Sequence, residues 1–202
     1  MIRPLLTLFT ILFFSACEKN FIAEPVDPRL PAYTEEGENI GGAYINDQPW
    51  IVENIPATFY SNTISGMRLQ YALDPEASSE KTRITFRHGI ILNENRYTEI
   101  KFYFKNYRLS NRTELKAVEG TKINLDNQSA WAELILGEQQ DQDTLLSTNG
   151  AFYIRNVEYV PDREHTIVSG TFGFEVESGD SLISISSGRY DFDIDNLEFY
   201  VF

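Results

Sequence analysis

Apolar and polar residues alternate with a period of two along most of the chain after residue 40. Such alternation predicts β-strands with one buried and one exposed face. Turn-forming pairs such as Asn46-Asp47 and Asp74-Pro75 separate these stretches. The predicted strands cover residues 67–73, 83–92, 130–136, 151–160, 166–176, 182–194 and 197–202. Many short strands on short links predict an all-β fold, a single antiparallel, largely meandering β-sandwich or barrel-like domain over residues 40–202.

Residues 98–116 carry two periods at once. Ile100, Phe102 and Phe104 alternate as in a strand, whereas the basic residues of the segment recur at helical steps of three and four. Aromatic crowding favours a strand in the first half. A short helix is predicted near residues 111–118.

The first seventeen residues follow a different pattern. One positive charge, Arg3, precedes residues 5–14, which are apolar apart from two threonines. Ten helical residues reach about 15 Å, half of the ~30 Å apolar core of a bilayer, so the run fits a signal peptide better than a membrane span. Two small residues and Cys17 follow directly.

The ending Ser15-Ala16-Cys17 resembles the bacterial lipobox, although the usual leucine is replaced by another large apolar residue, Phe14. The resemblance implies a lipoprotein signal peptide over residues 1–16, cleavage between Ala16 and Cys17, and lipidation of Cys17. Two or three acyl chains, such as palmitate, would hold the protein on a membrane durably. A plain secretory signal and an uncleaved anchor are the alternatives.

Residues 17–39 are interpreted as a lipidated N-terminus followed by a flexible tether. Pro25, Pro28 and Pro31 among acidic residues favour an extended chain. The chain of 202 residues has a formal net charge of −13, which excludes nucleic acid as a partner. Cys17 is the only cysteine, so its acylation would leave no thiol for a disulfide, a metal site or a nucleophile.

Four stretches together resemble a family of small Bacteroidetes lipoproteins of unknown function. They are residues 41–50, 148–159, 168–176 and 186–194. The last two resemble the closing hairpin of the family, a Gly-x-Phe-x-Phe strand followed by a Gly-Arg-aromatic-Asp strand. The resemblance implies an exported, lipid-anchored β-domain and carries over no catalytic residue.

The residues after Cys17 partly resemble signals that send such lipoproteins to the cell surface. Lys19 fits this pattern, whereas Asn20 and Phe21 do not. Attachment to the outer membrane is expected, and the periplasmic side and the cell surface both remain open. The partners expected are this membrane, through the lipid, and an unidentified protein or glycan.

A run of alternating aspartates is the candidate metal site. Asp191, Asp193 and Asp195 share one face of a predicted strand, with Phe192 and Ile194 on the other face. Carboxylates at this spacing, about 6.6 Å apart, would bind Ca²⁺ if a neighbouring segment added oxygens. The alternative is a solvated strand face, and no other cofactor is predicted.

A basic and aromatic strip is the candidate ligand-binding site. By strand parity it comprises Lys101, Tyr103, Lys105 and Tyr107. The strip would receive an anionic glycan, or it is an ordinary solvent face with amphipathic tyrosines. Trp50 and Trp131 would also stack on sugars, but their apolar neighbours predict that both lie in the core.

No residue is predicted to be catalytic. His88 is expected in a strand and His165 in a polar turn, and neither lies in a serine-nucleophile or zinc-helix motif. Thr144 and Ser181 follow aspartates in triplets that resemble O-glycosylation sites of exported Bacteroidetes proteins. Thr144 is expected in an exposed acidic loop.

Two functions are consistent with these patterns. The first is a lipid-anchored, non-enzymatic β-domain of the cell envelope that binds a partner or has a structural role. The alternative is an envelope enzyme or glycan-binding module that acts on polysaccharide. Two carboxylates held at a fixed separation in a cleft would favour the enzyme.

Overall fold

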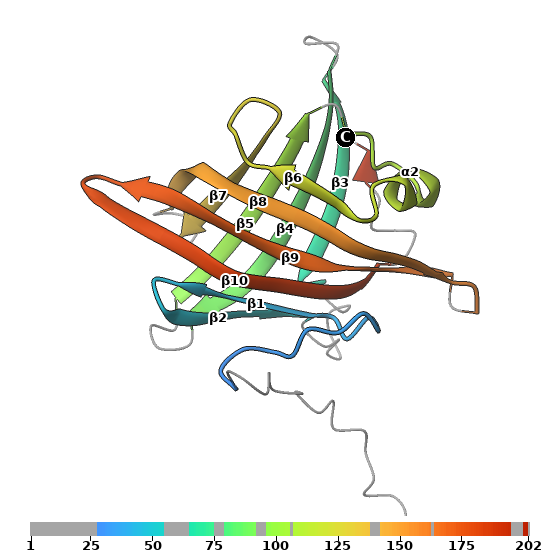
Figure 1. Cartoon of the computed structure of the whole chain (residues 1–202), viewed down its shortest axis with the longest axis horizontal. Coiled ribbons are helices and arrows are strands. Elements are labelled where there is room, and N and C mark those ends of the chain that lie inside the picture. Colours follow the sequence, from blue (N-terminus) through green and yellow to red (C-terminus); the bar gives the residue numbers. More distant parts are fainter. Residues whose placement is uncertain are drawn as a thin grey trace, which may run out of the picture.

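The strands predicted from the alternation are present and form a closed barrel (Figure 1). The computed structural model describes residues 28–54, 65–74, 79–91, 96–105, 107–137, 142–162, 164–194 and 200–201. The strands are β1 (Ile40–Ile45), β2 (Gln48–Glu53), β3 (Met67–Asp74), β4 (Ser79–Ile91), β5 (Arg96–Lys105), β6 (Thr121–Asn124), β7 (Ala130–Leu136), β8 (Asp143–Val160), β9 (His165–Ser178), β10 (Ser181–Ile194) and β11 (Tyr200–Val201). The all-β fold class is therefore confirmed.

Eight antiparallel strands close the barrel in the order β4-β2-β1-β10-β9-β8-β7-β5, and β5 pairs again with β4. Strands β7 to β10 pair in chain order, as a meander does. The first and last barrel strands meet where Gly41 of β1 pairs with Tyr190 of β10. In Figure 1, β8, β9 and β10 cross in front of β3, β4 and β5, so the reader looks at the outer face of this wall.

Strands β3 and β6 lie outside the closed barrel and pair with two of its long strands, β4 and β8. One edge of β4 pairs with β3 over residues 79–86 and with β2 at residues 90–91. One edge of β8 pairs with β7 over residues 143–146 and with β6 over residues 151–154. Part of the predicted last strand is present as β11, which pairs in parallel with β3 outside the antiparallel barrel.

Aromatic side chains fill the interior of the barrel. The ring of Phe86 alone has five other rings within 5.4–6.5 Å of its centroid. The inward-facing aromatic residues are Trp50, Phe86, Phe102, Phe104, Phe152, Phe172, Phe174, Tyr190 and Phe192, and none is more than 5% exposed. Each buried phenylalanine contributes about 1.5–3 kcal/mol by leaving water. The prediction that Trp50 lies in the core is confirmed.

Trp50 lies directly on the backbone of β4. A Cβ atom added at Gly89 would lie 2.0 Å from Trp50 Nε1, so this close approach requires glycine. The register of β4 and β5 shifts between Phe86 and Gly89, as at a β-bulge. The indole thus packs where the strand is irregular.

The short helix predicted near residues 111–118 is α2 (Arg112–Ala117). Asn111 caps it by accepting from the N–H of Glu114 at 3.0 Å, and Glu114 accepts in return from the N–H of Ser110 at 2.8 Å. The loop after α2 and the helix itself cover an edge of β8, since Glu119 accepts from the N–H of Val157 and Lys116 donates to its carbonyl. Such covering protects a strand edge from pairing with another chain.

Part of the predicted flexible tether over residues 17–39 is docked on the barrel, which corrects that prediction for residues 30–39 only. Its described C-terminal part, which we call the strap (residues 30–39), lies on the barrel wall. Leu30 is fully buried, and Arg189 of β10 donates to the carbonyl of Pro31 at 3.3 Å. Residues 1–27, with the predicted signal peptide and Cys17, lie outside the described residues. Across the described ranges, no helix combines the length and apolarity needed to cross a membrane.

Candidate functional site on the outer wall

Three cross-strand neighbours on the outer face form what we call the ladder: Arg83 of β4, Tyr103 of β5 and Trp131 of β7. The rings of Tyr103 and Trp131 stack with centroids 4.9 Å apart and planes 9° from parallel. The guanidinium of Arg83 lies 5.9 Å from the Tyr103 ring centroid. Trp131 therefore lies on the outer face, and the prediction that it belongs to the core is wrong.

The side chains around the ladder are engaged with one another. Tyr103 donates to Glu133 at 3.0 Å, and its partial burial raises the pKa of its phenol, to which the nearby Glu133 carboxylate adds. Lys105 Nζ lies 5.3 Å from the Trp131 ring centroid, and Lys101 pairs with Glu99 at 3.3 Å. Because Tyr103 and Trp131 turn ring faces toward each other, a sugar ring cannot stack between them.

Tyr107 does not continue the predicted strip. Its ring meets that of Phe104 edge-on, with centroids 6.1 Å apart, and thus packs against the core. Strand β5 ends at Lys105, so the strict alternation ends before Tyr107. The predicted common face holds for Lys101, Tyr103 and Lys105 only.

The predicted aspartate run lies under the strap. Asp191 is 2% exposed and accepts from the hydroxyl of Thr34 at 2.5 Å. It also accepts from the backbone N–H groups of Glu36, Gly37 and Glu38 at 3.0–3.2 Å. A cation at this carboxylate would replace these donors, so the strap and the predicted Ca²⁺ compete for the same oxygens.

The other two aspartates of the run do not complete a metal site in the described structure. Asp193 lies 2.9 Å from Nδ1 of His165, and Asp195 lies outside the described residues. Among the described residues, no three His, Cys, Asp or Glu side chains are grouped as a metal site would require. His165 begins β9 and does not lie in a turn, whereas His88 lies in β4 as predicted.

The two predicted O-glycosylation residues are both exposed. Thr144 lies in β8, paired with Ile135 of β7, which corrects the prediction that it lies in a loop. Ser181 follows the tight turn between β9 and β10 as predicted, opposite Ser178. Modification at either residue stays a prediction.

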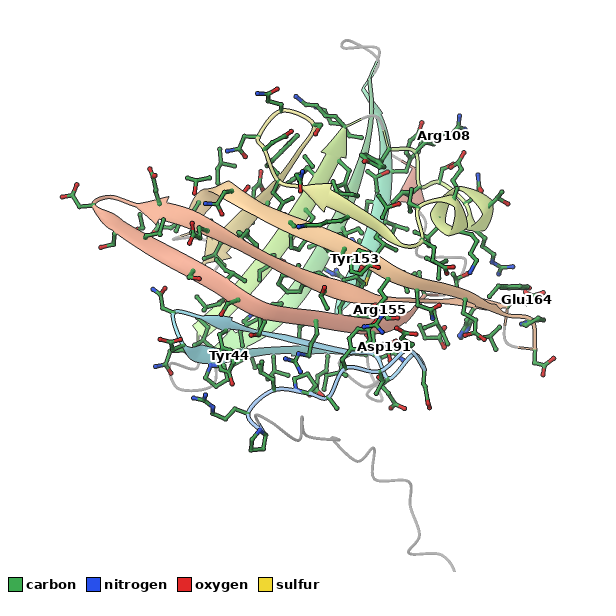
Figure 2. The ribbon with its side chains drawn as sticks, in the orientation of Figure 1. Tyr44, Arg108, Tyr153, Arg155, Glu164 and Asp191 are labelled. Carbon is green, nitrogen blue, oxygen red and sulfur yellow. The ribbon has the colours of Figure 1, made fainter. Side chains whose placement is uncertain are left out.

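A shallow depression on the same outer face as the strap was not predicted. It has a volume of about 590 Å³ and lies over β6, β8 and β9, on the wall that faces the reader in Figure 1. Its lining residues are Gly120, Lys122, Ala151, Tyr153, Thr171, Phe172 and Gly173. Figure 2 labels Tyr153 on this wall, with Arg155 and Asp191 nearby.

The register of three strands creates this depression. Lys122, Tyr153 and Thr171 are consecutive cross-strand partners, and Ala151 and Gly173 form the neighbouring pair. Each residue alone is ordinary in sequence, so only the alternation could have placed them on the outer face. Which outward residues meet depends on pairings between distant strands, including the bulge between Ile154 and Asn156.

Comparisons with protein-family models, with curated proteins and with solved structures found no match.

Proposed function

We propose that this protein is a lipid-anchored β-barrel of the cell envelope that binds a partner protein or a glycan on its outer wall, without catalysing a reaction. The observation that carries the binding role is the filled interior. Phe86, Phe102 and Phe152 are fully buried at its centre, which leaves the outer wall as the surface on which a ligand would be held.

The carboxylates of the described residues support binding over glycan cleavage. Hydrolysis of a glycosidic bond needs two carboxyl groups about 5–9.5 Å apart and open to the substrate. Asp191 and Asp193 are neighbours on one strand face, but the strap covers the first and His165 holds the second. This arrangement suits a structural role for both side chains.

The lipid anchor rests on the sequence around Cys17, the small residues before it and the apolar run that precedes them. One acyl chain gives only marginal membrane binding, so a diacylated and N-acylated cysteine would make attachment durable. The strap would then join this anchor to the wall formed by β1 and β10, through Leu30 and Asp191.

Metabolic labelling tests the anchor. Cells that express the full chain are grown with a clickable fatty acid, and the protein is then isolated and reacted with a fluorophore. We expect labelling of the wild type and of Phe14→Leu, which restores the usual lipobox residue, and no labelling of Cys17→Ala. Equal labelling of the wild type and Cys17→Ala would refute the lipoprotein assignment.

A further inference from the structure

The polar side chains of the depression over β6, β8 and β9 have no bonding partners among the described residues, whereas those at the ladder are paired. Within the described part of the chain, the side chains of Lys122, Tyr153 and Thr171 make no hydrogen bond or ion pair, and the Tyr153 ring contacts no other ring. Three hydrogen-bond donors, an ammonium, a phenol and a hydroxyl, thus lie side by side across three paired strands. A ligand would satisfy them without breaking any existing pair.

Two glycines of β9, Gly170 and Gly173, differ in how closely neighbouring atoms approach them. A Cβ at Gly170 would lie 2.0 Å from the carbonyl oxygen of Tyr153, so the barrel requires glycine there. A Cβ at Gly173 would meet only the carbonyl oxygen of Ile185, at 3.3 Å. A side chain at Gly173 would require the strands to shift by a few tenths of an ångström, far less than at Gly170, and glycine leaves a flat surface beside Tyr153.

Two basic side chains, Lys122 and Arg189, and one acidic side chain, Glu175, lie around the depression in a protein whose formal net charge is −13. Lys122 is exposed at the rim, and Arg189 pairs across the strands with Thr171. Arg155, two residues after Tyr153 on β8, is paired with Glu35 of the strap at 3.1 Å and so adds no net charge. Local positive charge attracts an anionic ligand that the rest of the surface would repel.

We propose that the depression binds one acidic sugar unit of a polysaccharide, such as a uronic acid. The apolar C–H face of the sugar packs against the Tyr153 ring and the Ala151–Gly173 floor. The carboxylate is bound by Lys122, and ring hydroxyls bond to Thr171 and the Tyr153 phenol. This assignment rests on the proposed function, since it names the ligand class and the place on the outer wall.

Isothermal titration of the full-length protein in detergent micelles tests the site. The probe is tetragalacturonate, and the neutral comparison is maltotetraose. We expect the wild type to bind tetragalacturonate and not maltotetraose. Tyr153→Ala and Lys122→Gln are each expected to weaken binding about tenfold or more, the loss typical of a hydrogen bond to a charged group or of a stacking surface.

Matched variants separate the site from the rest of the wall. Gly173→Val fills the floor and is expected to abolish binding, with thermal unfolding by circular dichroism as the check on folding. Tyr159→Ala removes an exposed tyrosine of β8 outside the depression, and Lys105→Gln removes a lysine of the ladder region. Both are expected to bind as the wild type does.

Four results would overturn the assignment. They are no binding by the wild type, equal binding of maltotetraose, binding unaffected by both Tyr153→Ala and Lys122→Gln, and binding unaffected by Gly173→Val in a folded protein. Loss of binding in Lys105→Gln alone would move the site to the ladder and leave an outer-wall binding function intact. Failure of Cys17 labelling, in contrast, would refute the lipid anchor and leave this titration unchanged.

Discussion

The Asp191 carboxylate is expected to hold the strap on the barrel. It is 2% exposed and accepts from the hydroxyl of Thr34 and from three consecutive backbone N–H groups at residues 36–38. Asp191→Asn keeps the shape and one acceptor oxygen, but it removes the negative charge and places an NH₂ donor among these donors. The substitution therefore removes the attraction and adds repulsion at the same point.

The magnitude follows from the number of bonds at this carboxylate. A hydrogen bond to a charged group contributes a net ~1.5–3 kcal/mol, and bonds that share one acceptor are not additive. Two such bonds already amount to ~3 kcal/mol, or roughly a hundredfold in the opening equilibrium of the strap. Because the strap can open while the barrel stays closed, the free energy of global unfolding should change by less.

Amide hydrogen exchange followed by NMR or mass spectrometry measures this opening. In Asp191→Asn, the amides of residues 36–38 are expected to exchange about a hundredfold or more faster, by the same conversion of free energy into opening equilibrium. Asp193→Asn is the matched control, because the carboxylate of Asp193 contacts His165 and its strand position is two residues away. Unchanged exchange at Gly37 in Asp191→Asn would show that the carboxylate does not hold the strap.

Two further predictions concern stability. Gly89→Ala places a Cβ 2.0 Å from Trp50 Nε1, so urea unfolding should show a loss of about 1–3 kcal/mol or more. The comparison variant Gly173→Ala, whose Cβ would lie 3.3 Å from one carbonyl oxygen, should lose less, and equal losses would refute the close-packing argument. The N–H groups of Gln128 and Ser129 lower the pKa of Asp126 to about 2. The ionised Asp126 carboxylate therefore stabilises the fold above the ordinary pKa of about 3.9, and this stabilisation is lost as pH falls through about 2. The free energy of unfolding of Asp126→Ala, measured by chemical unfolding at several pH values, should fall less over that interval than that of the wild type. An NMR titration that places the Asp126 pKa at its ordinary value would contradict this.

The period-two pattern predicted the strands well because a closed, filled barrel buries every second residue. Ile100, Phe102 and Phe104 point inward as the alternation requires. The same rule, applied strictly, places Trp131 outside, since Ala130 and Ala132 on either side are fully buried. Apolar neighbours therefore misplace Trp131, whereas its strand parity predicts its position on the outer face.

Other features carried no local signal. The strap contacts Asp191 largely through backbone N–H groups, which every non-proline residue has, so a proline-containing acidic segment gave no sign of docking. The depression depends on which residues of β6, β8 and β9 become cross-strand partners. Bulges shift that register, and their positions cannot be read from alternation alone.

The pairing of β1 with β10 has a consequence for how the chain folds. Ile40 meets Asp191, so the barrel cannot close until nearly the whole domain is available. Contacts between residues so far apart in sequence make folding slow, because the entropy of closing a long loop is lost before any contact compensates for it. Until then β1 and β10 each present an unpaired edge, which is a liability for aggregation. The edge of β1 is therefore open to other chains until β10, the last strand of the barrel, has formed and paired with it.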